Sequence, residues 1–199
     1  MTMEIFEQAI DWVKHFCRQG TQLEVNLFGV GESTMNPNLV KMVEYARNRL
    51  PIRQRLHLNT NGILMTPELA KELKRAGISE IDVTYHADAR VTANTIRILM
   101  AESIAGQLSV DPVTRPNNWA GQVDWLEPDY SYPCPWLGRG QAMVMSDGNV
   151  TRCCIDAFAT GVMGTIFDDL TEMVTEPFEL CYSCHQTIPE TMKRIEIAK

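Results

Sequence analysis

The first 111 residues alternate between two periods of hydrophobic and polar positions. Apolar residues recur at helical spacing over residues 3–17, in a segment that starts at Pro37, over residues 67–76 and over residues 91–105. Short β-prone runs at residues 23–30, 55–60, 80–85 and 107–111 follow these helices in turn. Strands separated by helices of this length predict right-handed crossovers and a parallel sheet, so residues 1–111 are expected to form a partial βα barrel.

Several residues predict where these helices begin, end and face. Thr66 is the expected N-cap of the third helix, and Gly77 is the expected end of it. Pro37 is expected in the first turn of the second helix, and Met100 on the inner face of the fourth.

Polar or glycine-rich segments follow three of the expected strands. They cover residues 29–33, 59–62 and 84–88. In parallel sheets ligands bind at the carboxyl ends of the strands, so these segments form a candidate binding edge. From spacing alone they are equally consistent with ordinary turns.

Length and charge then limit the class of protein. The 199 residues are 45% apolar, and 18 basic against 25 acidic residues give a net charge of −7. This charge argues against nucleic-acid and anionic-membrane partners. The sequence contains no run of apolar residues long enough to span a membrane, and its start is acidic rather than a cationic leader, so a cytoplasmic protein is expected. A full βα barrel needs about 250 residues, so the barrel must be partial.

The sequence pattern changes from residue 112 onwards, where prolines and aromatic residues interrupt regular structure. We expect a linker over residues 112–133 and a small cysteine-rich module over residues 134–199, with a hairpin over residues 141–152 around an Asp-Gly turn. The six cysteines are Cys17, Cys134, Cys153, Cys154, Cys181 and Cys184. Cys17 lies on the apolar side of the first helix pattern, which favours a buried thiol.

Four thiolates suit either tetrahedral zinc or a [4Fe-4S] cluster. The four candidate thiolates are those of Cys134, one cysteine of the Cys153-Cys154 pair, Cys181 and Cys184. Two adjacent cysteines do not easily bind one centre, so one of the pair is expected to be a packed thiol. Spacing alone leaves zinc and iron-sulfur as equal alternatives.

These cysteines resemble those of a radical S-adenosylmethionine protein with a SPASM or twitch-type auxiliary cluster domain. The shared pattern is Cys134, a hairpin, Gly148 followed five positions later by Cys153, and the distal Cys181-x2-Cys184. The resemblance implies that Cys134, Cys153, Cys181 and Cys184 hold one [4Fe-4S] cluster. It selects Cys153, with Cys154 as the alternate, and it makes zinc the alternative metal.

The N-terminal part resembles the same family in two loops. Residues 30–33, Val-Gly-Glu-Ser, are similar to the family's Gly-Gly-Glu-Pro loop, and residues 59–62 resemble the end of its next strand. The resemblance implies residual S-adenosylmethionine positions at Gly31, Glu32 and Asn59. The family's Cys-x3-Cys-x2-Cys loop is not in this sequence, which argues for a truncated chain and against S-adenosylmethionine binding by these residues alone.

Two classes of function follow from this resemblance. The first is an accessory or electron-transfer iron-sulfur protein, with Trp136 and Tyr182 near the cluster and a redox partner. The second is a radical S-adenosylmethionine enzyme whose cluster loop is supplied by another polypeptide or is missing from this chain. A structural zinc or cluster site in a partner-binding protein is a further alternative. The sheet edge at residues 23–30 would be unpaired, which predicts a homodimer or a protein partner there.

Overall fold

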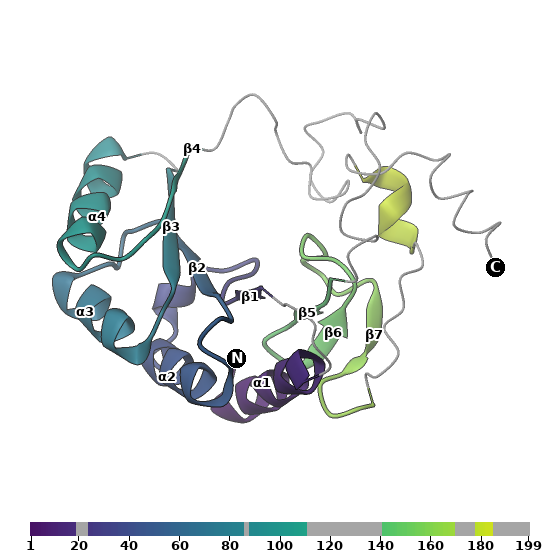
Figure 1. Ribbon diagram of the computed structural model, residues 1–199. Coiled ribbons are helices and arrows are strands. Elements are labelled where there is room, and N and C mark those ends of the chain that lie inside the picture. The colour runs from purple at the N-terminus through teal and green to yellow at the C-terminus, as the bar shows by residue number, and fades with distance from the viewer. Residues whose placement is uncertain (19–23, 86–87, 111–140, 170–177, 185–199) are drawn as a thin grey trace. The chain divides into compact units, whose positions relative to one another are not determined.

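The computed structural model describes residues 1–18, 24–85, 88–110, 141–169 and 178–184, drawn in colour in Figure 1. The chain divides into two compact units, Met1–Asp111 and Pro112–Lys199. The expected linker and Cys134 lie outside the described residues, as does the side chain of Cys17. No helix in the described ranges is both long enough and apolar enough to cross a membrane.

The first unit is a four-stranded parallel sheet with helices between its strands, which confirms the predicted α/β class. Its helices are α1 (Met3–Arg18), α2 (Leu39–Arg49), α3 (Pro67–Ala76) and α4 (Ala89–Ala101). Its strands are β1 (Val25–Asn26), β2 (Leu56–Thr60), β3 (Glu80–Tyr85) and β4 (Leu108–Val110), in the order β1-β2-β3-β4. A short 3-10 turn, η1 (Ser33–Met35), follows β1.

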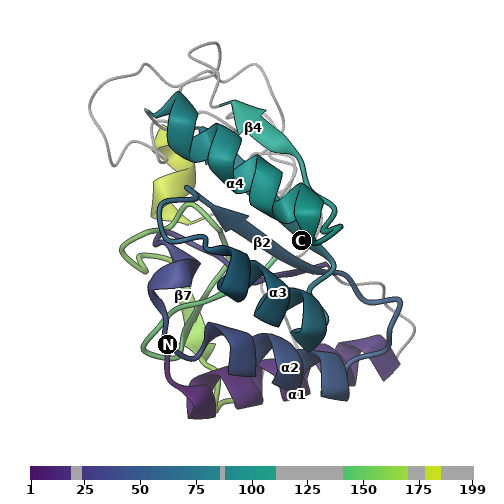
Figure 2. The same cartoon turned by 90° about the vertical axis from the view of Figure 1, so that its left-hand side faces the viewer.

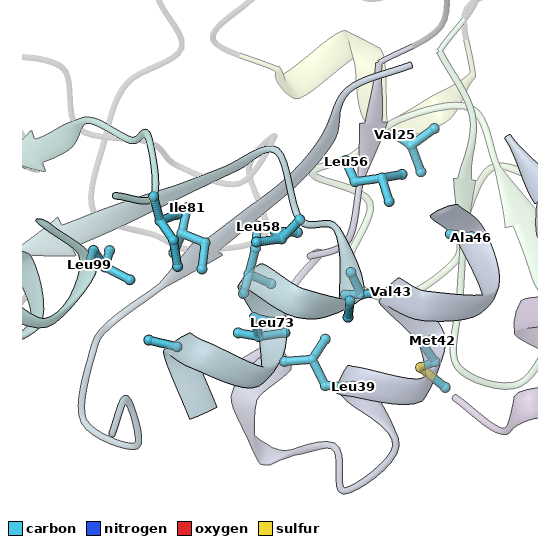
Figure 3. Packing of buried hydrophobic residues seen from close by; sticks show 14 of the residues in the cluster. Val25, Leu39, Met42, Val43, Ala46, Leu56, Leu58, Leu73, Ile81 and Leu99 are labelled. Atoms are coloured by element: carbon cyan, nitrogen blue, oxygen red, sulfur yellow. The ribbon is translucent and has the colours of Figure 1, made fainter. Parts of the chain in front are cut away.

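The two faces of this sheet differ in chemistry because side chains alternate along each strand. The four helices lie side by side along one face, as Figure 2 shows. Apolar residues of the strands, among them Leu56, Leu58 and Ile81, point into the core beneath those helices (Figure 3). The intervening positions, His57, Asn59 and others, are only half-buried and polar. The core therefore fixes which residues of each strand are left for the opposite face.

Both predicted limits of α3 are confirmed. The Thr66 hydroxyl accepts a hydrogen bond from the Leu69 N–H at 3.1 Å, and Gly77 ends α3 with a left-handed φ of 94°. At this φ an L-residue is strained, which is why glycine terminates the helix here.

Three expectations about element limits are wrong. Pro37 precedes α2, whose N-cap is Asn38. The fourth helix ends at Ala101, and Met100 is 72% exposed because it lies on the outer side of α4, whereas Leu99 is buried. The first strand is only Val25–Asn26, since after one further backbone bond, from Leu27 to β2, the chain bends away.

The described part of the second unit contains a three-stranded antiparallel sheet. The strands β5 (Met143–Val144), β6 (Asn149–Thr151) and β7 (Val162–Thr165) lie in the order β5-β6-β7. The predicted hairpin of β5 and β6 is confirmed, and Gly148 adopts a φ of 94° in its turn. Strand β7 was not predicted, because Gly164 interrupts its pattern. The 3-10 turn η2 (Glu179–Ser183) completes the described elements.

Candidate functional site

Glu32 joins the loop after β1 to the end of β2. Its Oε1 accepts hydrogen bonds from the Thr34 N–H (3.1 Å), the Thr34 hydroxyl (2.5 Å) and the Thr60 hydroxyl (2.8 Å). Its Oε2 accepts one from the Asn61 N–H at 2.8 Å. A single carboxylate therefore holds together the carboxyl ends of two neighbouring parallel strands, at the edge where such sheets bind ligands.

The surroundings of Glu32 keep its carboxylate ionised. Burial raises the pKa of Glu32. The hydrogen bonds from Asn61, Thr34 and Thr60 lower it, and their combined effect is larger than that of burial, so the pKa lies below its ordinary value. An ionised carboxylate offers about four acceptor positions, and the hydrogen bonds above concentrate on Oε1. Oε2 therefore has the capacity to accept a further donor, such as an ammonium group.

The other residues predicted at this edge differ in their surroundings. Gly31 is exposed, and a Cβ added to it would meet no atom within 4 Å. Asn59 lies on the polar face of the sheet, where its Oδ1 accepts a 2.8 Å hydrogen bond from the Thr84 hydroxyl. Ser33, at the position where the family has proline, donates to the Leu27 carbonyl at 2.7 Å and so braces the loop.

A row of polar side chains crosses the same sheet face and was missed in the sequence. His57 Nδ1 lies 2.9 Å from Asn26 Oδ1 and 3.4 Å from Glu24 Oε1, while His57 Nε2 lies 3.1 Å from Asp82 Oδ2. Parallel strands buried on both faces read as continuous apolar runs. Alternating polar residues in β2 and β3 were therefore a usable signal that one face is polar.

The described cysteines come from two segments that are distant in the sequence. Cys153 and Cys154 follow β6, while Cys181 lies in η2 and Cys184 caps it. Cys184 is buried with Ile155, and Cys153, Cys154 and Leu180 pack against this pair. The four described cysteines form no disulfide with one another. Three of the predicted metal positions, together with Cys154, thus lie in one described unit.

The adjacent cysteines differ in acidity. The hydrogen bond between their thiols, together with burial, raises the pKa of Cys153 above its ordinary value. The same hydrogen bond lowers the pKa of Cys154 to about 6, against the opposing effect of burial and with the help of Gln141. One sulfur of the pair is therefore readily a thiolate, the form that binds metals.

The donor set fits an iron-sulfur cluster by its chemistry. Cysteine thiols gathered from two turns are the usual ligands of a [4Fe-4S] cluster, in which each iron takes one thiolate. Within the described ranges, no three Cys, His, Asp or Glu side chains are placed to hold a single metal ion. Because Cys134 lies outside those ranges, the described set comprises three of the four predicted ligands and the alternate.

Comparison with known proteins agrees with the fold. Residues 2–100 match the Radical SAM superfamily. Proteins of this superfamily use a [4Fe-4S] cluster and S-adenosylmethionine. A search of curated proteins found no match.

Two solved structures, both of BtrN, share the fold. The first is BtrN in complex with AdoMet and 2-DOIA, at 23% identity and a TM-score of 0.66, over 83% of this chain and 65% of BtrN. The second is selenomethionine BtrN in an open conformation, at 21% identity and a TM-score of 0.60, over 83% of this chain and 63% of that one. The chain thus spans less than two thirds of the length of these structures.

Proposed function

We propose that this protein carries one [4Fe-4S] cluster on Cys134, Cys153, Cys181 and Cys184 and acts as an accessory or electron-transfer protein. The observation that carries the proposal is the packing of Cys153, Cys154 and Cys184 around Ile155. The match of residues 2–100 to the Radical SAM superfamily favours iron-sulfur chemistry over zinc. A cluster with four cysteine ligands has no open iron, which suits outer-sphere electron transfer to a redox partner.

Metal analysis of the anaerobically purified full chain tests this proposal. We expect about four iron and four sulfide per chain, and loss of the cluster signal in electron paramagnetic resonance when Cys134, Cys153, Cys181 or Cys184 is replaced by alanine. Cys154→Ala is the matched control and should keep the cluster. Uptake of zinc alone would overturn the proposal, and loss of the cluster in Cys154→Ala but not in Cys153→Ala would exchange their roles.

The redox behaviour of the cluster distinguishes an electron-transfer role from a structural role. A cluster that transfers electrons is reduced and reoxidised reversibly in an accessible range. Protein-film voltammetry of the loaded chain should therefore show one reversible couple. A cluster that survives but gives no reversible couple would instead support a structural site.

A second candidate function is radical S-adenosylmethionine chemistry completed by a Cys-x3-Cys-x2-Cys loop from outside these 199 residues. The observation that favours it is the ionised Glu32, whose Oε2 has acceptor capacity at the ligand edge of the sheet. Isothermal titration with S-adenosylmethionine should then give binding that Glu32→Gln weakens, and Glu44→Gln should not. Formation of 5′-deoxyadenosine by the reduced protein, with or without a partner polypeptide, would establish the enzyme.

We also propose a protein partner, or a second copy, at the edge strand β1. The Val25 N–H donates to the carbonyl of Arg55, directly before β2, and the Leu27 N–H donates to the carbonyl of His57 in β2, so the backbone of Asn26 is directed to the other side. In the described part of the chain, β1 pairs only with β2. Sedimentation should show association that Asn26→Pro weakens, whereas Asn26→Ala removes only the side chain. A monomer at every concentration, with no partner retained, would contradict this.

A further inference from the structure

Asp156 is a fully buried carboxylate in the turn that follows the cysteine pair. Its Oδ1 accepts hydrogen bonds from the Thr160 N–H and hydroxyl, both at 2.9 Å, and its Oδ2 accepts one from the Gly161 N–H at 2.8 Å. The N–H of Asp156 itself donates to the Cys153 carbonyl at 3.2 Å. The carboxylate therefore closes the loop from Asp156 to Gly161, and the Asp156 backbone N–H ties the start of this loop to Cys153, a predicted cluster ligand.

The hydrogen bonds of the Asp156 side chain stabilise a loop conformation that is otherwise unfavourable. Burying a carboxyl group is unfavourable unless hydrogen-bond donors reach its oxygens, and here three do. Ala159, inside the loop, adopts a φ of 55°, a conformation that non-glycine residues disfavour. The loop is thus held in one shape by the carboxylate, against local preference.

The far end of this loop contacts the second cysteine segment. Gly161 is buried, and a Cβ added to it would lie 2.5 Å from the ring of Phe178. The Phe178 carbonyl accepts a 2.8 Å hydrogen bond from the Cys181 N–H, which starts the turn that carries Cys181 and Cys184. The Arg152 guanidinium lies 5.6 Å from the centre of the same ring. Phe178 is therefore held between the residue before Cys153 and the glycine that Asp156 anchors.

We infer that Asp156 is a positioning residue, which docks the Cys153 turn against the Cys181–Cys184 turn through Gly161 and Phe178. This inference rests on the proposed cluster site and names what pre-organises it. The carboxylate fixes Gly161, the missing side chain of Gly161 admits the Phe178 ring, and Phe178 fixes the start of η2. Groups that orient metal ligands without touching the metal commonly change metal affinity by about 10- to 100-fold.

Two substitutions break this connection at different points. Asp156→Asn keeps the size and one acceptor but presents an NH2 group to the Gly161 N–H, so one donor loses its partner. Gly161→Ala adds a methyl group where the Phe178 ring lies. Asp168→Asn is the matched control, because the exposed Asp168 accepts hydrogen bonds from Thr165 in a turn without cysteines.

The first measurement is iron release from the anaerobically loaded full chain to a chelator. We expect Asp156→Asn and Gly161→Ala to release iron about tenfold faster or more, and Asp168→Asn to match the wild type. Adding Phe178→Leu to Gly161→Ala should slow the release again, because the smaller side chain makes room for the methyl group. Such recovery separates positioning from simple unfolding.

The second measurement needs no cluster and so separates this inference from the proposed function. Dibromobimane joins two thiols that lie close together, and peptide mapping of the apo chain identifies the joined pair. The wild type and Asp168→Asn should join Cys184 to Cys153 or Cys154, and Asp156→Asn should lose most of that product. Equal cross-linking in all three proteins would overturn the positioning role, even if the cluster were present.

Discussion

Glu32 and Asp156 use one physical device at two places. Each carboxylate accepts hydrogen bonds from backbone N–H groups and threonine hydroxyls, at distances of 2.5–3.1 Å for Glu32 and 2.8–2.9 Å for Asp156. Glu32 joins the ends of two strands, while Asp156 closes a single loop. A carboxylate has two oxygens that accept such bonds, whereas an amide has one. Asn or Gln therefore cannot fully replace either carboxylate.

Glu32→Gln should therefore destabilise the first unit by about 1–2 kcal/mol at neutral pH, since the Asn61 N–H loses its acceptor. The pKa of Glu32 is lowered in the folded protein, so its contribution is present above the ordinary value of 4.5 and is lost as the pH falls through the folded value. The difference in unfolding free energy between the wild type and Glu32→Gln should therefore become smaller as the pH falls.

Amide hydrogen exchange of β2 and β3 in increasing urea measures this difference at neutral and acidic pH. Glu44→Gln, which changes an exposed carboxylate on α2, is the control and should alter the exchange little. A Glu32→Gln deficit that stays constant down to strongly acidic pH would contradict the assigned hydrogen bonds.

At the scale of elements, one arginine joins α2 to the ends of two other segments. The Arg47 side chain donates to the Gly77 carbonyl at 3.0 Å, to the Gln54 carbonyl at 3.1 Å from two nitrogens, and to the Ser79 hydroxyl at 3.0 Å. The Ser79 hydroxyl accepts in turn from the Leu56 N–H, which opens β2. Helix α2, the end of α3 and the start of β2 are therefore held by one guanidinium.

Arg47→Lys should cost about 2 kcal/mol, because an ammonium group cannot reproduce the planar fork and leaves buried acceptors unsatisfied. Arg49→Lys is the matched control, since Arg49 is 44% exposed and pairs with Asp11 at 3.6 Å. It should cost under about 0.5 kcal/mol. Urea unfolding followed by hydrogen exchange compares the two, and equal effects would show that the fork of Arg47 contributes little.

At the scale of the whole molecule, the two units have separate cores. The large core draws its residues from the first unit alone, whereas the described core around the cysteines contains Ile155 and Cys184 with three partly buried neighbours. A core this small would gain much of its stability from the proposed cluster, while the first unit has enough apolar burial of its own.

Removing the proposed cluster should therefore affect the two units unequally. We expect hydrogen exchange protection of β5, β6 and β7 to fall markedly after anaerobic chelation, with β2 and β3 unchanged. The comparison uses the full chain before and after chelation. A uniform loss of protection in both units would show that their stabilities are coupled.

Most elements of the described fold could be predicted from local sequence patterns. The strands β2 and β3, the α3 limits at Thr66 and Gly77, and the hairpin around Gly148 follow from side-chain period and turn chemistry within a few residues. The prediction was wrong at β1, where the chain bends away after Leu27, and at Met100, which lies on the outer side of α4. The cysteine ligand set stays a prediction, because Cys134 lies outside the described residues.

The sequence by itself determined the alternation of helices and strands, the polar ends of those strands and the spacing of the cysteines. Only the tertiary structure decided that the Glu32 carboxylate meets the Asn61 N–H, that His57 lies between Asn26 and Asp82, and that Gly161 receives the Phe178 ring. The physical reason is range. Periodicity and capping act over a few residues, whereas these contacts join segments whose distance depends on strand register and loop closure.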